Sequence, residues 1–61
     1  MKINKDKTYR VEKFTEAQDS DYGCLPGSDV KAILRGYKYD ADLEMWFNRK
    51  GTIGYAVTEI D

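Results

Sequence analysis

The sequence predicts a single, predominantly β domain, and three features of the chain support this fold class. Its 61 residues suffice for one small domain, 1–61, in which residues 1–7 can form a flexible N-terminal segment. Apolar residues alternate with other residues in both halves of the chain, with the period of two that half-buried strands have. Clusters of Gly, Pro and acidic residues interrupt this alternation and mark turns. We therefore expect an all-β fold of four or five short antiparallel strands.

The first expected strand covers residues 8–15. Tyr9 and Val11 lie on one face of an extended chain, and Phe14 lies with the polar residues on the other face. Residues 16–28 are mostly acidic or small and include glycine and proline, which predicts a long loop. Loops longer than about 12 residues are uncommon in compact domains and often have a function.

A β-hairpin is expected near the C-terminal end. Large apolar residues alternate along 43–47 and again along 53–57, so the two segments read as paired strands. Asn48 and Gly51 suit the turn between them, because both residue types tolerate positive φ. The residues expected to supply much of the core are Val11, Val30, Ala32, Leu34, Met45, Phe47, Ile53 and Ala56.

Residues 29–35 fit two different structures. Ser28 as an N-cap and Gly36 just beyond the last turn would frame a short helix. The apolar residues from Val30 to Leu34 also alternate as they would in a strand. We favour the strand, and the alternative is an α+β arrangement, β-α-β-β, with a short helix at 29–35.

The composition argues against catalysis and against metal or cofactor binding. Histidine, the commonest acid–base residue near neutral pH, is absent, and so are phosphate loops, dinucleotide fingerprints and metal-ligand spacings. Cys24 is the only cysteine, so we expect a partly buried structural thiol without an internal disulfide. Asp40, Asp42 and Glu44 alternate, and a solvated strand edge that resists aggregation explains them better than a cation site. We therefore expect no enzyme, no cofactor and no metal.

Charge and hydropathy restrict the location and the partners. The formal net charge of −1 argues against a protein that mainly grips nucleic-acid phosphates. The chain has neither the apolar stretch of a secretory signal nor a run long enough to cross a bilayer. These features predict a cytoplasmic protein with no membrane partner.

The order of strand, acidic loop, Pro-Gly turn, strand and hairpin resembles an SH3-like small barrel. Residues 25–33 (Leu-Pro-Gly-Ser-Asp-Val-Lys-Ala-Ile) resemble the diverging turn and following strand of an SH3 domain, and 16–22 is similar to its RT loop. Trp46 and the Gly-Tyr-Ala-Val run at 54–57 resemble the tryptophan strand and the strand that closes the barrel. Val57 stands where peptide-binding members carry proline, so the resemblance implies the fold rather than recognition of proline-rich peptides.

Aromatic residues in or beside the expected loops are the remaining functional signal. Tyrosine and tryptophan commonly anchor interfaces, and acidic residues in 16–28 would orient a partner with a basic surface. We expect a protein-binding module, an inhibitor or adaptor of a larger protein, of the kind found among accessory proteins of bacteria and phages. Self-association would be a further source of stability. The residues expected to contact the partner are Asp19, Asp21, Tyr22, Tyr37, Tyr39 and Trp46.

Nucleic-acid binding is the alternative function. Tyr37 and Tyr39 would stack on bases, and nearby basic residues would contact phosphates. The balanced net charge makes this alternative the less favoured one. The basic residues concerned are Arg35, Lys38, Arg49 and Lys50.

Overall fold

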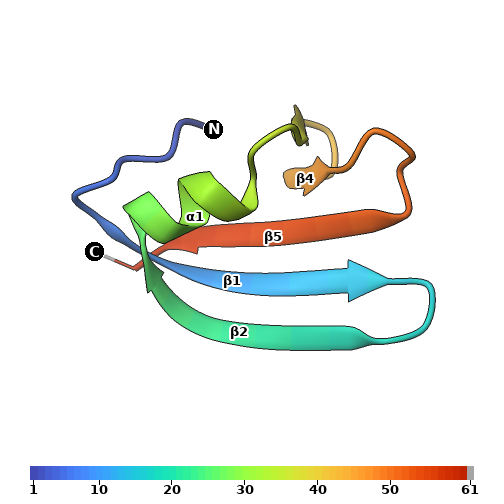
Figure 1. Cartoon of the computed structure of the whole chain (residues 1–61), viewed down its shortest axis with the longest axis horizontal. Coiled ribbons are helices and arrows are strands. Elements are labelled where there is room, and N and C mark those ends of the chain that lie inside the picture. The colour runs from blue at the N-terminus through green and yellow to red at the C-terminus, as the bar shows by residue number, and fades with distance from the viewer. Residues whose placement is uncertain (61) are drawn as a thin grey trace.

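The computed structural model of the protein describes residues 1–60. Along the chain the elements are β1 (Thr8–Thr15), β2 (Asp19–Pro26), α1 (Gly27–Ile33), β3 (Lys38–Asp40), β4 (Met45–Phe47) and β5 (Ile53–Glu59). All strand pairs are antiparallel, and the five strands form one sheet in the order β2-β1-β5-β4-β3 (Figure 1). The expected antiparallel fold of four or five strands is thus confirmed, as an open sheet with β2 and β3 at its edges. No helix within residues 1–60 is long and apolar enough to cross a membrane.

β1 lies between β2 and β5 and defines the two faces of the sheet. Tyr9 and Val11 are fully buried, and the strand register places Leu25 and Val57 on the same face. We call this the inner face, because α1 and the N-terminal residues pack against it (Figure 1). Phe14 lies on the opposite, outer face, because side chains alternate along the strand.

The segment expected to be a long loop, 16–28, is mostly strand β2. Only residues 16–18 connect β1 to β2. The hydroxyl of Thr15 closes this turn, since it donates to the Gln18 carbonyl oxygen (2.9 Å) and accepts from the Gln18 N–H (3.2 Å). The sequence conceals β2 because solvated positions of an edge strand carry acidic and small residues instead of alternating apolar ones.

The strand favoured for residues 29–35 is wrong, because α1 covers Gly27–Ile33. Val30 and Leu34 lie four residues apart and are both buried against the sheet, as one face of a helix requires. Ala32, between them, is exposed. Val30, Ala32 and Leu34 stand at alternate positions, which fits a strand. Val30 and Leu34 alone also fit one face of a helix, so this pattern does not distinguish a helix from a strand.

Both ends of α1 lie two residues before those of the expected helix, and its C-cap residue is Leu34. The N-cap residue is Pro26 rather than Ser28, and no side chain caps the helix. At the other end Gly36 has a φ of 84°, which glycine adopts readily. The N–H of Tyr37 then donates to the Leu34 carbonyl oxygen (2.9 Å) and closes the last turn.

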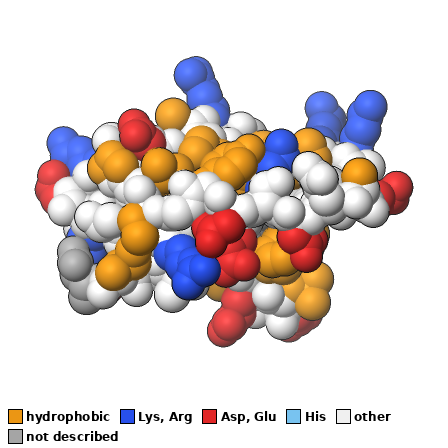
Figure 2. All heavy atoms as spheres, turned by 90° about the horizontal axis from the view of Figure 1, so that it is seen from below, with side chains coloured by type: hydrophobic (Ala, Val, Ile, Leu, Met, Phe, Trp, Pro, Cys, Tyr) orange, Lys and Arg blue, Asp and Glu red, His pale blue; other side chains and the backbone are white. Residues whose placement is uncertain are grey.

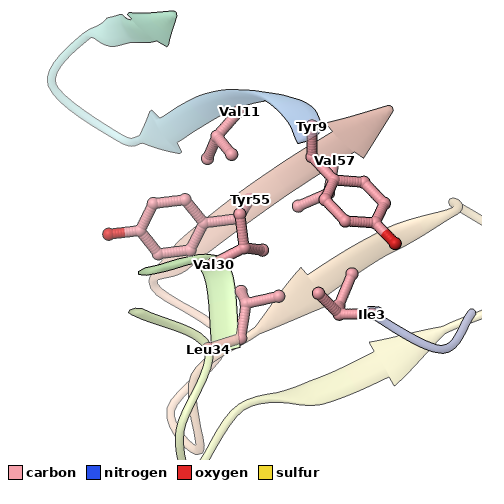
Figure 3. Packing of buried hydrophobic residues seen from close by; sticks show 7 residues of the cluster. All are labelled: Ile3, Tyr9, Val11, Val30, Leu34, Tyr55 and Val57. Carbon is pink, nitrogen blue, oxygen red and sulfur yellow. The ribbon is translucent and has the colours of Figure 1, made fainter. Parts of the chain in front are cut away.

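Residues 1–7, which we call the N-terminal arm, add a side chain to the core. Ile3 is only 6% exposed and lies between Tyr9 and Leu34 (Figure 3). The N–H of Asn4 donates to the Tyr9 hydroxyl oxygen (2.8 Å), which gives the buried tyrosine a polar partner. The segment expected to be flexible therefore covers one end of the inner face.

Gly27 allows the arm to pass close to the start of α1. Its N–H donates to the Lys7 carbonyl oxygen at 2.7 Å. A Cβ at this position would lie 2.7 Å from the Asn4 carbonyl carbon and 2.9 Å from the Lys5 Cα, and would overlap the Asn4 carbonyl oxygen. The position therefore requires glycine for space rather than for a special φ.

The hairpin of β4 and β5 is confirmed, but β4 turns to the core the face opposite to the one expected. Tyr55 and Val57 lie in the core, whereas Met45 and Phe47 are half-buried on the outer face. A Cβ on Gly54 would lie 2.8 Å from Met45 Cε and 2.9 Å from Phe47 Cε1, so both side chains lie over this glycine. Alternation determines which residues share a face, and contact with the helix determines which face is buried.

The turn of this hairpin uses its two characteristic residues differently. Gly51 has a φ of 72°, as expected for the left-handed position. Asn48 acts through its side chain, whose oxygen accepts from the N–H groups of Thr52 (2.8 Å) and Ile53 (3.1 Å).

The buried core overlaps only in part with the expected core residues. Its buried members are Ile3, Tyr9, Val11, Val30, Leu34, Tyr55 and Val57 (Figure 3). Of the expected core residues, Val11, Val30 and Leu34 are confirmed, Met45, Phe47, Ile53 and Ala56 are half-buried, and Ala32 is exposed.

Candidate functional site

Aromatic side chains form a row across the inner face of the sheet. Trp46 faces Tyr55 on one neighbouring strand and Tyr39 on the other, and the rings of Tyr39 and Trp46 are 5.2 Å apart. The rings of Tyr22 and Tyr37 lie 5.9 Å and 5.3 Å from that of Tyr55. We call these five residues the aromatic row. Four of the residues expected to bind a partner therefore gather around the buried Tyr55.

Tyr22 joins the aromatic row because β2 contains a β-bulge. Val11 faces Gly23 and Glu12 faces Asp21, so Tyr22 is an extra residue without a partner in β1. Gly23 has a φ of 76°, and its N–H donates to a carboxylate oxygen of Asp21 at 2.8 Å. The bulge thereby allows the Tyr22 ring to lie beside Tyr55 on the inner face.

Tyr22 and Tyr55 have opposite pKa shifts. Burial raises the pKa of Tyr55 above its ordinary value, and the neighbouring phenols of Tyr22 and Tyr37 raise it further. The neighbouring phenol of Tyr55 lowers the pKa of Tyr22, and the positive charge of Lys13 contributes in the same direction. Tyr22 is 42% exposed, so it is the most accessible ring of the row.

Asp19 and Asp21 lie on the outer face, away from the aromatic row. The register places Asp19 opposite Phe14, and the Asp21 carboxylate is 3.1 Å from the Arg10 guanidinium. The hydrogen bond from Gly23 and the bond from Arg10 lower the pKa of Asp21. The acidic and aromatic residues predicted to act together are therefore on opposite faces.

Viewed from the β2 side, hydrophobic side chains reach the surface among acidic and basic ones (Figure 2).

Trp46 contributes to packing more than to an accessible surface. Its ring is half-buried and packs against the core cluster. The indole Nε1 is buried and has no hydrogen-bond acceptor among residues 1–60. A buried donor without an acceptor costs about 1–3 kcal/mol, so Trp46 is held at this position by the packing of its ring.

The outer face carries an apolar patch that no element of the described chain, residues 1–60, covers. Phe14 faces Gly54 across β1 and β5, and the side chains of Met45 and Phe47 lie over the same glycine. Leu43, in the turn between β3 and β4, is 61% exposed. We call this surface the outer patch; its members are Phe14, Leu43, Met45, Phe47 and Ala56.

Acidic residues predominate around the outer patch. The register places Glu12 beside Ala56 and Asp40 beside Met45 on this face. Lys38 faces Phe47 and is the base closest in register to the patch, since Arg10 is paired with Asp21. The patch therefore combines an apolar centre with a mainly acidic border.

The basic residues considered for nucleic-acid binding are only partly brought together. Lys38 and Arg49 line one hollow of about 350 Å³, together with Gly36 and Asn48. Tyr37 and Tyr39, the rings expected to stack on bases, pack instead against Tyr55 and Trp46.

Cys24 is exposed on β2, so the expected partly buried thiol is wrong. The register places it opposite Arg10 on the outer face. Among residues 1–60 no three His, Cys, Asp or Glu side chains are grouped so that they could hold a metal ion.

Sequence reasoning missed the outer patch because it assigned Met45 and Phe47 to the core. The run Met45-Trp46-Phe47 is apolar at successive positions, so one face of β4 had to be apolar outside the core. That is the signal that could have revealed the patch.

Comparison with protein-family models, with curated proteins and with solved structures gives no match for this chain.

Proposed function

We propose that the protein is a small non-catalytic module that binds another protein through the outer patch. The observation that carries this proposal is an apolar sheet face that no helix or strand of residues 1–60 covers, while the only helix of these residues and Ile3 of the N-terminal arm pack on the opposite face. Leu43 alone is 61% exposed, and Phe14, Met45 and Phe47 are half-buried. Docking would remove this surface from water, at about 25 cal/mol per Å² of apolar area.

The border of the outer patch specifies the chemistry of the partner. Glu12, Asp19 and Asp40 lie on the outer face, so a partner with basic groups around an apolar centre is complementary. Such charges mainly accelerate association, and salt weakens their effect. By occupying a surface of a larger protein, the module would act as an inhibitor or an adaptor, in the manner of bacterial or phage accessory proteins.

An SH3-like small barrel is part of this proposal. Five antiparallel strands in one sheet are compatible with such a fold. Residues 25–33, however, form the end of β2 and α1 instead of a diverging turn and strand. The proposal therefore concerns the general fold and does not include a proline-rich ligand.

The test compares two substitutions on opposite faces of the sheet. Partners captured from native lysate on the immobilised protein are identified by mass spectrometry, and their affinities for purified variants are measured. Leu43→Glu and Tyr22→Glu each place one charge on an exposed apolar residue, so they are matched. We expect Leu43→Glu to weaken binding by about tenfold or more and Tyr22→Glu to leave it unchanged. Loss of binding with Tyr22→Glu alone would assign the interface to the aromatic row.

Nucleic-acid binding is the second candidate, supported by the hollow that Lys38 and Arg49 share. If this hollow holds a phosphate, binding of a labelled oligonucleotide should weaken as salt rises, and Arg49→Gln should reduce the salt dependence. Binding that is absent at low salt, or unchanged in Arg49→Gln, would remove this candidate.

A further inference from the structure

The second half of β5 has a neighbouring strand on one side only. β5 pairs with β1 from Ile53 to Glu59, whereas β4 pairs only with Gly54 and Tyr55. Glu44, the residue before β4, has a φ of 54° and lies in the turn that connects β3 to β4. Beyond Tyr55 the sheet therefore has a gap beside β5.

The gap leaves main-chain groups of Val57 and Glu59 without a neighbouring strand. The N–H of Ile60 donates to the Thr8 carbonyl oxygen (3.1 Å), so the hydrogen-bonded pairs with β1 lie at every second residue before Ile60. Val57 and Glu59 fall between these pairs and direct their N–H and C=O groups away from β1. On that side neither residue has a main-chain partner within residues 1–60. We call this segment the open edge.

A hollow of about 520 Å³ lies beside the open edge. Phe14, Leu43 and Met45 of the outer patch line it, together with Val57 and Glu59 of the open edge and Met1 at the start of the N-terminal arm. Side chains of a strand laid along Val57 and Glu59 would alternate between the two faces of the sheet. Every second side chain would therefore enter the hollow and contact the apolar residues of the patch.

Two side-chain carboxylates line the hollow, and they favour a basic residue in the ligand. The only charged side chains that line it are those of Glu44 and Glu59, among residues 1–60. Glu59 already has a cation, since its carboxylate is 3.3 Å from Lys7 Nζ. Glu44 has no ion pair with any described residue, so it is the carboxylate available to a ligand.

We propose that the open edge binds an extended segment of the partner protein as an added strand, with an apolar side chain in the hollow and a Lys or Arg side chain at Glu44. This inference rests on the proposed function, because it specifies how the partner reaches the outer patch. Main-chain hydrogen bonds to Val57 and Glu59 supply affinity, and the hollow and Glu44 select the side chains.

Peptides selected on the immobilised full chain from a phage-displayed random decapeptide library provide the probe. We expect apolar residues at alternate positions of the selected peptides. We also expect the peptides to contain Lys or Arg. In the free protein the amides of Val57 and Glu59 should exchange rapidly with solvent. Saturating peptide should slow their exchange by about tenfold or more, as measured by nuclear magnetic resonance. Unchanged exchange at both amides, or selection of no peptide, would overturn the inference.

Glu59→Pro and Glu59→Ala form a matched pair of variants. Both remove the ion pair with Lys7, but only proline also removes the N–H at the open edge. The bonds to β1 are preserved, because the Glu59 N–H points away from that strand. Peptide affinity should fall by about tenfold or more in Glu59→Pro relative to Glu59→Ala. Equal affinities would overturn the inference, and the exchange measurement on the unmodified protein decides if Glu59→Pro fails to fold.

The variants separate this inference from the proposed function. A captured partner that binds Glu59→Pro normally and loses affinity for Leu43→Glu would leave the outer patch as the interface and refute strand addition. A partner insensitive to both substitutions would refute both proposals. Protection of Val57 and Glu59 that increases with protein concentration in the absence of peptide would assign the open edge to a second copy of the chain, against the inference.

Discussion

Replacing Gly27 by alanine should lower the free energy of unfolding by about 3 kcal/mol. The added Cβ would lie 2.7 Å from the Asn4 carbonyl carbon and 2.9 Å from the Lys5 Cα. Carbon atoms pack at about 3.5 Å or more, and main-chain atoms cannot rotate away as a side chain can. The N-terminal arm must therefore move off the start of α1.

The magnitude follows from what the arm would lose. Ile3 is 6% exposed, and full burial of such a side chain is worth about 1.5–3 kcal/mol. The hydrogen bonds from Asn4 N–H to Tyr9 and from Gly27 N–H to Lys7 contribute about 1 kcal/mol each. Alanine offsets about 1 kcal/mol, because it favours the helix over glycine. The net loss is comparable to the ~3–5 kcal/mol that the core of so small a domain can supply.

Urea denaturation followed by Trp46 fluorescence measures the effect. Ser28→Ala, at the neighbouring exposed position, is the control and should change stability by no more than ~0.5 kcal/mol. Ile3→Ala should cost about 2–4 kcal/mol, and Gly27→Ala should cost much less in that background, because the arm is already loosened. The reasoning is refuted if Gly27→Ala is as stable as the wild type, or if the two substitutions are additive.

Three further predictions concern single side chains. Because burial raises the folded-state pKa of Tyr55, its stability contribution should be complete below the ordinary tyrosine pKa of about 10 and should disappear as pH rises through the folded value. Denaturation of the wild type and Tyr55→Phe should show this alkaline loss in the wild type alone. The pKa of Asp21 is lowered in the folded state. The difference in unfolding free energy between the wild type and Asp21→Asn should therefore be complete above pH ~4 and vanish as pH falls through the folded-state pKa. A difference that does not change with pH would contradict the ion pair. Cys24→Ser should change stability by no more than ~0.5 kcal/mol, because the thiol is exposed, and should leave partner binding intact.

Periodicity predicted the strands better than it predicted their buried side. The alternation in β1 and in the hairpin of β4 and β5 is correct, because side chains of a strand always alternate. Both faces of β4 are apolar, so nothing local shows that Trp46 rather than Met45 faces the core. Which face of β4 is buried depends on where α1 and Ile3 pack. Their contacts with the sheet join residues that are distant in sequence.

The candidate site was predicted in its residue types but not in its arrangement. The bulge at Tyr22 brings that ring to the inner face and leaves Asp21 on the outer one, a separation that sequence spacing does not reveal. The left-handed conformation of Glu44, in the turn before β4, is likewise hidden, because glutamate is not a residue type that favours it. Both features depend on single backbone conformations rather than on composition.

Binding through the outer patch is the central claim, and mapping a captured partner by nuclear magnetic resonance tests it most directly. Uniformly labelled protein is mixed with the unlabelled partner, and cross-saturation is measured at each amide. The outer patch predicts the strongest effects at Phe14, Leu43 and Met45, with little effect at Tyr22 and Tyr37. The strongest effects at Tyr22 and Tyr37, with none at the patch, would contradict the claim and place the interface on the aromatic row.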